Sequence, residues 1–199
     1  VLESYLDSDN LKIAQLPINV GANGFYGHRI YAAFTHLIDT PYVLYLDQDC
    51  SFQSHHVQSC IQTIEEKNLD WSYSLRQIYD KDGNYVCNDD CESLGKWPSC
   101  LGEEDYFVDV GCYFLPKNIA LQCTPLWYRK AREPGVPEVD RILSHVLRQN
   151  KLTCDTNGLY TLNYRTGNTE RSVKKEFFLH HNELMKQRYN GTLPWQKTL

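Results

Sequence analysis

The most constraining feature of the sequence is an uninterrupted apolar run at residues 42–46 (YVLYL), followed at once by an Asp-Gln-Asp triplet at residues 47–49. Such a run is typical of a strand that is buried on both faces, as in the centre of a parallel sheet. Residues 11–16 predict another strand, and residues 26–37 place apolar side chains at helical spacing between the two. This order predicts a βαβ unit and therefore an α/β fold.

The rest of the chain continues to alternate helices and strands. Residues 71–79 and 85–87 flank a turn-forming Asp-Lys-Asp-Gly-Asn segment, which predicts a β-hairpin. Residues 138–149 carry apolar side chains on one face and predict an amphipathic helix. The remaining expected elements are helices at 57–67, from 116 onward and at 172–184, and strands at 108–115 and from 160 onward. A length of 199 residues fits a single domain, 1–199.

Composition excludes several classes of protein. A hydrophobic content of 42% allows a sizeable core, and no apolar run approaches the ~20 residues that span a bilayer. Twenty Lys and Arg residues against twenty-five Asp and Glu residues give a net charge of −5. That balance argues against a general nucleic-acid-binding protein, which usually carries a basic stripe.

Eight cysteines are many for a chain of this length, but they are scattered and several lie inside apolar segments. We expect them to be reduced and buried, where cysteine behaves as a small hydrophobe. An alternative for Cys87 and Cys91 is zinc ligation, although no second Cys or His pair completes such a site. Free thiols, together with no secretory signal and no membrane span, indicate a cytoplasmic protein.

Asp47 and Asp49 carry the clearest chemical signal. They follow the expected buried strand, and ligands of open α/β sheets bind beyond the carboxyl ends of strands. Carboxylates at positions i and i+2 can converge on one hard cation such as Mg²⁺ or Mn²⁺, which often shares its oxygen ligands with a diphosphate. The alternative is that both acids only cap the segment that follows.

A second candidate for diphosphate contact is the polar loop at residues 164–175. It combines Gly167 with Arg165, Arg171 and Lys174 ahead of an expected helix. Basic side chains and the N–H groups of a helix N-terminus can close over phosphate oxygens. The alternative is a loop that is merely solvated.

Residues 19–49 contain an Asn-x-Gly loop, a helix with an early Arg, a hydrophobic strand and an Asp-x-Asp motif. This ordered set resembles the centre of a family-2-type glycosyltransferase of the GT-A fold, with Asn19, Gly21, Arg29, Asp47 and Asp49 at the matching positions. The segments VDVGCYFLPKN and PEVDRILSHVL resemble the acceptor-side strand and the helix that carries the catalytic base. The resemblance covers most of residues 10–185.

The resemblance implies an α/β fold with a mixed, mainly parallel, Rossmann-like sheet flanked by helices. The nucleotide and metal part would span about residues 1–70, and the acceptor part about 71–199. In this family two strands and a helix precede the Asn-x-Gly loop. We therefore expect the first strands, which cradle the nucleotide base, to be missing from residues 1–199, and to belong to further domains or upstream residues of the same polypeptide if they exist.

The resemblance also implies a metal-dependent, inverting hexosyltransferase-type enzyme. It would move a sugar from a nucleotide-diphosphate sugar to a hydroxyl of a carbohydrate or glycoconjugate acceptor. Asn19, Gly21, Arg29 and Asp47 are the implied donor-binding residues, and Asp47 would also share a Mn²⁺ or Mg²⁺ ion with Asp49.

The implied catalytic base is Asp140 in the first turn of its helix, with Glu138 as the alternative. Both acids also suit a helix N-terminus through the helix dipole alone. A C-terminal histidine, His180 or His181, is implied as a further metal ligand and would favour Mn²⁺ over Mg²⁺.

Two other functions fit the same residues. A sugar nucleotidyltransferase also uses acids and a divalent metal, and it would release diphosphate rather than a nucleoside diphosphate. A non-catalytic carbohydrate-binding or scaffolding domain would keep the fold without needing Asp49.

Overall fold

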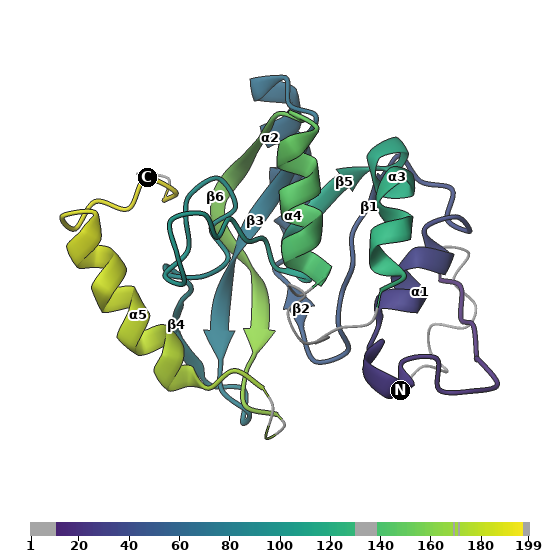
Figure 1. Ribbon diagram of the computed structural model, residues 1–199, viewed down its shortest axis with the longest axis horizontal. Helices are drawn as coiled ribbons and strands as arrows, with labels where there is room; N and C mark the ends of the chain where they lie inside the picture. Colours follow the sequence, from purple (N-terminus) through teal and green to yellow (C-terminus); the bar gives the residue numbers. More distant parts are fainter. Residues whose placement is uncertain (1–10, 130–138, 169, 171, 197–199) are drawn as a thin grey trace.

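The computed structural model describes residues 11–129, 139–168, 170 and 172–196. Within that part of the chain, six strands form one mixed sheet in the order β1-β5-β3-β6-β2, with β4 paired to β3 (Figure 1). The strands are β1 Tyr42–Val43, β2 Ser51–Phe52, β3 Trp71–Tyr79, β4 Tyr85–Asn88, β5 Tyr113–Pro116 and β6 Cys154–Arg165. The two longest strands, β3 and β6, are neighbours at the centre of the sheet.

Helices flank this sheet. They are α1 His28–Phe34, α2 His56–Lys67, α3 Lys117–Trp127, α4 Val139–Gln149 and α5 Lys175–Arg188. Figure 1 shows α1 and α3 together beside the β1 edge, whereas α5 lies at the opposite side against β3 and β4. Helix α2 packs on β3 and β6, and α4 packs beside α3. The class is therefore α/β, with a mixed sheet flanked by helices.

Amphipathic patterning explains why α4 lies where it does. Val139, Leu143 and Leu147 are buried along one face, whereas Arg148 on the opposite face is exposed. Ser144, also buried, shares a hydrogen bond with the Tyr113 hydroxyl at 2.7 Å, which ties α4 to the start of β5. This contact fixes the second turn of α4 relative to the sheet.

Several local predictions are confirmed. The helix expected at 57–67 is α2, and it ends at Asn68 in the left-handed conformation (φ 50°). The hairpin expected around residues 80–84 joins β3 to β4 in antiparallel pairing. The helices expected from 116, at 138–149 and at 172–184 correspond to α3, α4 and α5, and the strands expected at 108–115 and from 160 correspond to β5 and β6 with shifted ends.

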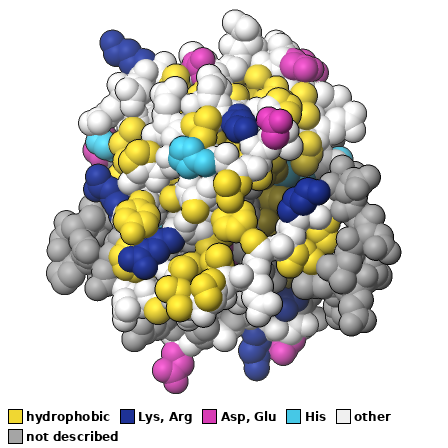
Figure 2. Space-filling view, turned by 90° about the vertical axis from the view of Figure 1, so that its right-hand side faces the viewer, with side chains coloured by type: hydrophobic (Ala, Val, Ile, Leu, Met, Phe, Trp, Pro, Cys, Tyr) yellow, Lys and Arg dark blue, Asp and Glu magenta, His cyan; other side chains and the backbone are white. Residues whose placement is uncertain are grey.

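The prediction of a βαβ unit is wrong. Residues 11–16 form no strand, and only Tyr42–Val43 of the 42–46 run pairs with a neighbour. Ile13 is 50% exposed, so burial does not drive strand formation there. Figure 2 faces this side of the molecule and shows apolar side chains at its surface. The exposed apolar side chains of the described residues include Leu11, Ile13, Leu16, Ile18 and Leu37.

The expected mainly parallel sheet is also wrong. Among the described strands, only β3 and β6 pair in parallel, and the other pairings are antiparallel. The apolar run at residues 42–46 favours a parallel neighbour, but only Tyr42–Val43 of it pairs, and the partner is the antiparallel strand β5.

The strand order determines where the Asp-Gln-Asp triplet lies. Strands β1 and β2 are at opposite ends of the order, so residues 44–50 must cross from one edge of the sheet to the other. The crossing carries Asp47 and Asp49 past the central strands.

No helix in the described residues is long and apolar enough to cross a membrane.

Candidate functional site

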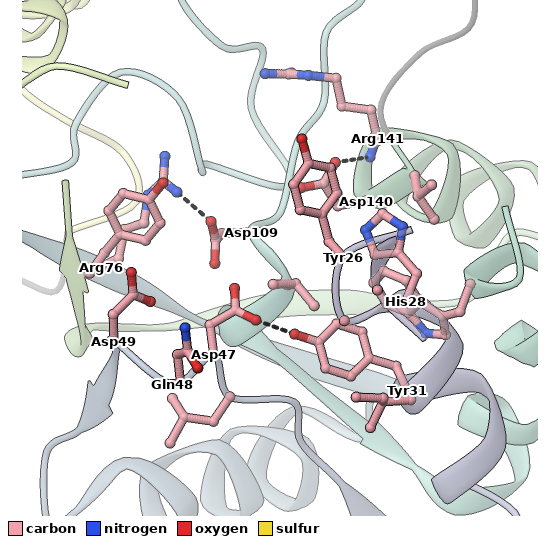
Figure 3. Close-up of a pocket in the computed structure, with 18 of the residues that line it drawn as sticks. Tyr26, His28, Tyr31, Asp47, Gln48, Asp49, Arg76, Asp109, Asp140 and Arg141 are labelled. Carbon is pink, nitrogen blue, oxygen red and sulfur yellow. Dashed lines mark hydrogen bonds and ion pairs between the residues drawn. The ribbon is translucent and has the colours of Figure 1, made fainter. Parts of the chain in front are cut away.

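A pocket of ≈ 990 Å³ opens where four segments of the chain meet (Figure 3). The segments are residues 19–31, residues 46–49 of the crossing loop, residues 107–110 before β5, and residues 139–141 at the start of α4. Its lining combines carboxylates with aromatic rings: Figure 3 shows Asp47, Asp49 and Asp109 on one side and Tyr26, His28 and Tyr31 on the other, with Asp140 beside Tyr26. Such a division suits a ligand with both a polar and a ring-shaped part.

Asp47 and Asp49 contribute two of these carboxylates from the crossing loop. Asp47 accepts a hydrogen bond from the Tyr31 hydroxyl, and Asp49 Oδ2 accepts one from Asn168 Nδ2 at 2.7 Å. Burial raises the pKa of Asp47, and the charges of Asp109 and Asp49 raise it further, against the opposing effect of the Tyr31 hydrogen bond. Burial is the main cause of the raised pKa of Asp47, and the neighbouring negative charges add to it.

Arg76 is a fully buried cation on β3 that reaches the same pocket. Its guanidinium binds three carboxylates through three different nitrogens. They belong to Asp89 at 2.7 Å, Glu92 at 2.5 Å and Asp109 at 2.5 Å. A buried charge is tolerated only when it is paired in this way. Because the carboxylates outnumber the guanidinium, Arg76 has no positive charge to spare for an anionic ligand.

Asp109 binds Arg76 and also lies near the other carboxylates of the pocket. Its Oδ1 accepts a hydrogen bond from the Gly111 N–H at 3.0 Å, while its Oδ2 binds Arg76. Figure 3 shows its carboxylate in the middle of the pocket, between Asp47 and Asp140. Its charge raises the pKa of both of these acids.

Asp140 enters the pocket from the first turn of α4. Its Oδ1 accepts a hydrogen bond from the Arg141 backbone N–H at 2.9 Å. Burial and the charge of Asp109 raise the pKa of Asp140 to about 7, although the neighbouring Arg141 guanidinium lowers it in part. A carboxyl group with a pKa near neutrality is suited to general acid–base catalysis.

Arg141 is itself held in place by two acids. Its guanidinium binds Asp105 at 2.5 Å and Glu92 at 2.8 Å. Glu92 therefore bridges Arg141 and Arg76 and links α4 to β3 through charge. Among the described residues that line the pocket, five carboxylates face two guanidinium groups.

Aromatic side chains form the opposite wall. The Tyr31 and Trp127 rings lie 5.5 Å apart, and the His28 ring lies 5.9 Å from Trp127. Tyr26 completes this wall and is 49% exposed. Its φ of 47° is in the left-handed region, which aromatic residues rarely adopt.

Asn19 and Gly21 of the Asn-x-Gly loop both line the pocket. The Gly21 N–H donates to Asn19 Oδ1 at 3.0 Å, and the Gly21 carbonyl accepts from the Tyr26 N–H at 2.9 Å. A Cβ at Gly21 would lie 2.4 Å from the Tyr26 carbonyl oxygen, which leaves no room for a side chain. The glycine is therefore required for the loop to fold back on Tyr26.

The structure does not bring every predicted residue to the pocket. Arg29 stacks its guanidinium 3.3 Å from the centroid of the Phe25 ring and does not line the pocket. Arg165, at the end of β6, and Lys174, before α5, are exposed and do not line it either. Glu138 and Arg171 lie outside the described residues.

The two histidines proposed as metal ligands lie on α5. His180 is exposed, and His181 Nδ1 lies 2.8 Å from the Phe177 carbonyl oxygen within its own helix. Neither lines the pocket. In the part of the chain that the structure describes, no three His, Cys, Asp or Glu residues are grouped to hold a metal ion.

The carboxylate oxygens of Asp47 and Asp49 are of the kind that hard divalent cations prefer. Two carboxylates are the usual protein contribution to a Mg²⁺ site, which takes its other ligands from water and substrate phosphates. The excess of acids over arginines in the pocket favours such a cation as well. All eight cysteines are free thiols, and Cys87 and Cys91 form no zinc site with other described residues.

Arg76, Glu92 and Asp109 are the residues that sequence patterns missed. Glu92 and Asp109 lie 16 and 33 positions after Arg76 in the chain and bind it only in the folded structure. One signal was present: Arg76 is the charged residue in WSYSLRQIY, a segment otherwise suited to burial. A charge inside a buried strand requires acidic partners, and two of the three, Asp89 and Glu92, are among the first acids after the hairpin.

No protein-family model matches this chain, and no curated protein matches it. The fold and the chemistry of the pocket are therefore what bear on its function.

Proposed function

We propose that the chain is a metal-dependent, inverting glycosyltransferase with a GT-A-type fold. The observation that carries the proposal is that Asp47, Asp49 and Asp140 line one pocket, although they lie up to 93 positions apart in the sequence. Asn19 and Gly21, from the same sequence resemblance, line that pocket too. A cytoplasmic location belongs to the proposal and is supported by the free thiols.

In the proposed reaction, a nucleotide-diphosphate sugar lies with its diphosphate toward Asp47 and Asp49. Arg76 and Arg141 are already bound to acids of this chain, so they are not free to neutralise a diphosphate. A divalent cation held by Asp47 and Asp49 would supply that neutralisation and act as a Lewis acid toward the departing nucleoside diphosphate.

Asp140 is the proposed general base. Its raised pKa lets it accept a proton near neutral pH. It would take the proton of the acceptor hydroxyl while that oxygen forms a bond to the anomeric carbon and the nucleoside diphosphate departs from the opposite face. A single displacement of this kind inverts the anomeric configuration. The aromatic wall, with Tyr26 at its exposed end, would pack against the sugar rings.

A thermal-shift screen tests the proposal. The ligands are UDP-, GDP-, CMP- and dTDP-linked sugars, each with and without Mn²⁺, on the wild type, Asp49→Asn and a control, Asp82→Asn. Asp82 is an exposed acid in the β3–β4 turn and does not line the pocket. A ligand that binds only the native state raises the melting temperature by mass action.

We expect one nucleotide class to stabilise the wild type and Asp82→Asn only with Mn²⁺, and Asp49→Asn not at all. Product analysis with the stabilising donor should then show release of a nucleoside diphosphate. Release of inorganic diphosphate from the corresponding nucleoside triphosphate and a sugar 1-phosphate would instead support a nucleotidyltransferase. Binding of a free oligosaccharide that is unchanged in Asp49→Asn, without any nucleotide effect, would support a non-catalytic carbohydrate-binding domain.

A further inference from the structure

Cys91 and Cys100 lie side by side in the loop between β4 and β5. The Cys100 N–H donates a hydrogen bond to the Cys91 carbonyl oxygen at 2.7 Å, which brings the two backbones together. Cys91 is fully buried and Cys100 is partly exposed. The Cys100 side chain is close enough to the Cys91 thiol to be the largest cause of the raised pKa of Cys91, ahead of burial.

The residues next to this pair hold the pocket together. Glu92 follows Cys91 and binds Arg141. Ser99 precedes Cys100, and its hydroxyl bonds to Asp105, the other carboxylate that binds Arg141. The 91–100 segment therefore contains one acid that binds Arg141 directly, Glu92, and a serine that hydrogen-bonds to the other, Asp105.

We propose that Cys91 and Cys100 form a reversible disulfide that is made and broken by exchange with a small-molecule disulfide such as oxidised glutathione. The inference is independent of the proposed transfer reaction. Within a cytoplasmic protein, such a bond is of the transient, regulatory kind. Oxidation would close the 91–100 segment and hold Glu92 and Asp105 in their positions around Arg141.

The chemistry proceeds by two thiol–disulfide exchanges. Cys100 reacts first because it is the more accessible thiol. Its thiolate attacks one sulfur of the small-molecule disulfide, and the other sulfur leaves as a thiolate. The Cys91 thiolate then attacks the Cys100 sulfur and displaces the second small thiolate. Two cysteine thiols are oxidised to one disulfide, the small disulfide is reduced to two thiols, and the two protons end on those thiols.

Mass spectrometry on the intact chain tests this directly. The protein is incubated with oxidised glutathione, unfolded in denaturant with iodoacetamide, and digested with trypsin. Cleavage after Lys96 separates residues 82–96 from residues 97–117, so the disulfide joins two peptides. These peptides also contain Cys87 and Cys112, and fragment ions distinguish them from Cys91 and Cys100.

We expect a Cys91–Cys100 linkage that dithiothreitol reverses. It should be absent in Cys100→Ser and present in Cys87→Ser, a matched change at another partly exposed cysteine. The melting temperature of the oxidised wild type should rise by about 5 °C, as expected for closing a short loop. Cys100→Ser should show no such rise.

The proposal is overturned if Cys91 is fully alkylated after oxidation, including the case in which Cys100 carries a stable glutathione adduct. A linkage of Cys91 to Cys87, or of Cys100 to Cys112, would overturn it equally.

Discussion

Asp140 combines a proposed catalytic role with an unfavourable effect on the stability of the folded protein. Burial and the nearby Asp109 raise its pKa to about 7, so the folded protein holds a proton there that the unfolded chain releases near pH 4. The same environment that prepares it to accept a proton therefore opposes its ionisation in the native state. The two consequences can be separated experimentally.

The catalytic consequence is tested with Asp140→Asn, which keeps the size of the side chain but cannot accept a proton. We expect transfer activity to fall by roughly 10²–10⁴-fold, the usual contribution of a general base. Mn²⁺-dependent stabilisation by the donor should remain, because Asp47 and Asp49 are unchanged. Unaltered activity in this variant would remove Asp140 from the mechanism and leave Glu138 as the candidate.

The stability consequence depends on pH. Between about pH 4 and pH 7 the native state binds more protons at Asp140 than the unfolded state, so its contribution to the free energy of unfolding falls as pH rises. The side chain of Asp140→Asn does not titrate, so this fall in the free energy of unfolding with rising pH is absent from the variant. We expect the variant to exceed the wild type by on the order of 2 kcal/mol at about pH 8 and to match it near pH 4, as measured by urea unfolding. An equal difference at both pH values would contradict the raised pKa.

Gly21 offers a prediction at the level of the loop that precedes α1. In Gly21→Ala, the new Cβ would approach the Tyr26 carbonyl oxygen to 2.4 Å, so the loop must move. We expect a loss of about 1–3 kcal/mol in the free energy of unfolding and weaker donor binding. Gly102→Ala is the control, because a Cβ at Gly102 meets nothing within 4 Å. Comparable losses in both variants would show that the close approach is not the cause.

Strand β3 carries the prediction for the charge network, because Arg76 is anchored there. Arg76→Met leaves Asp89, Glu92 and Asp109 without their common cation. We expect a loss of about 3–5 kcal/mol near pH 7.5 and a smaller one near pH 5, where the freed carboxyl groups can take up protons. Unfolding measured at both pH values tests this, with Arg76→Lys as an intermediate case and Lys67→Met as an exposed ion-pair control. A pH-independent loss would mean that packing, not charge, is what Arg76 provides.

Elements with a strong local pattern could be predicted from the sequence. The amphipathic face of α4 and the turn residues between β3 and β4 are local signals, and both elements were found where expected. The direction of strand pairing was not predictable, because it depends on contacts between segments far apart in the chain. The strand expected at residues 11–16 failed for a related reason: its apolar residues have no sheet to pack against.

The residues of the candidate site fall into the same two groups: those that local sequence predicts and those that depend on distant contacts. Asp47, Asp49 and Asp140 stood out because each occupies a recognisable place next to a strand or a helix. Arg76 and Asp109 did not, since their roles depend on one another and appear only when β3 meets the segment before β5. For the whole molecule, the acids of a pocket can thus be anticipated, whereas the groups that tune their pKa values require the fold.

At the scale of the whole molecule, hydrogen exchange should follow the sheet. Strands β3 and β6 form the central parallel pair and should exchange most slowly, whereas residues 11–27, which are mainly exposed, should exchange quickly. Adding the donor found in the thermal-shift screen, with Mn²⁺, should slow exchange around Gly21 and leave α5 unchanged. Slower exchange in α5 would indicate that His180 or His181 takes part in binding.

The excess of carboxylates in the pocket has a kinetic consequence. Five acids against two already paired arginines make the empty pocket repel any polyanion that approaches without a cation. Under the proposed function, binding is therefore ordered: the donor enters with its metal, or after it. The same repulsion acts at the end of the cycle, since a nucleoside diphosphate that loses its cation is expelled. The pocket's charge would thus favour release of the metal-free nucleotide as well as set the conditions for entry.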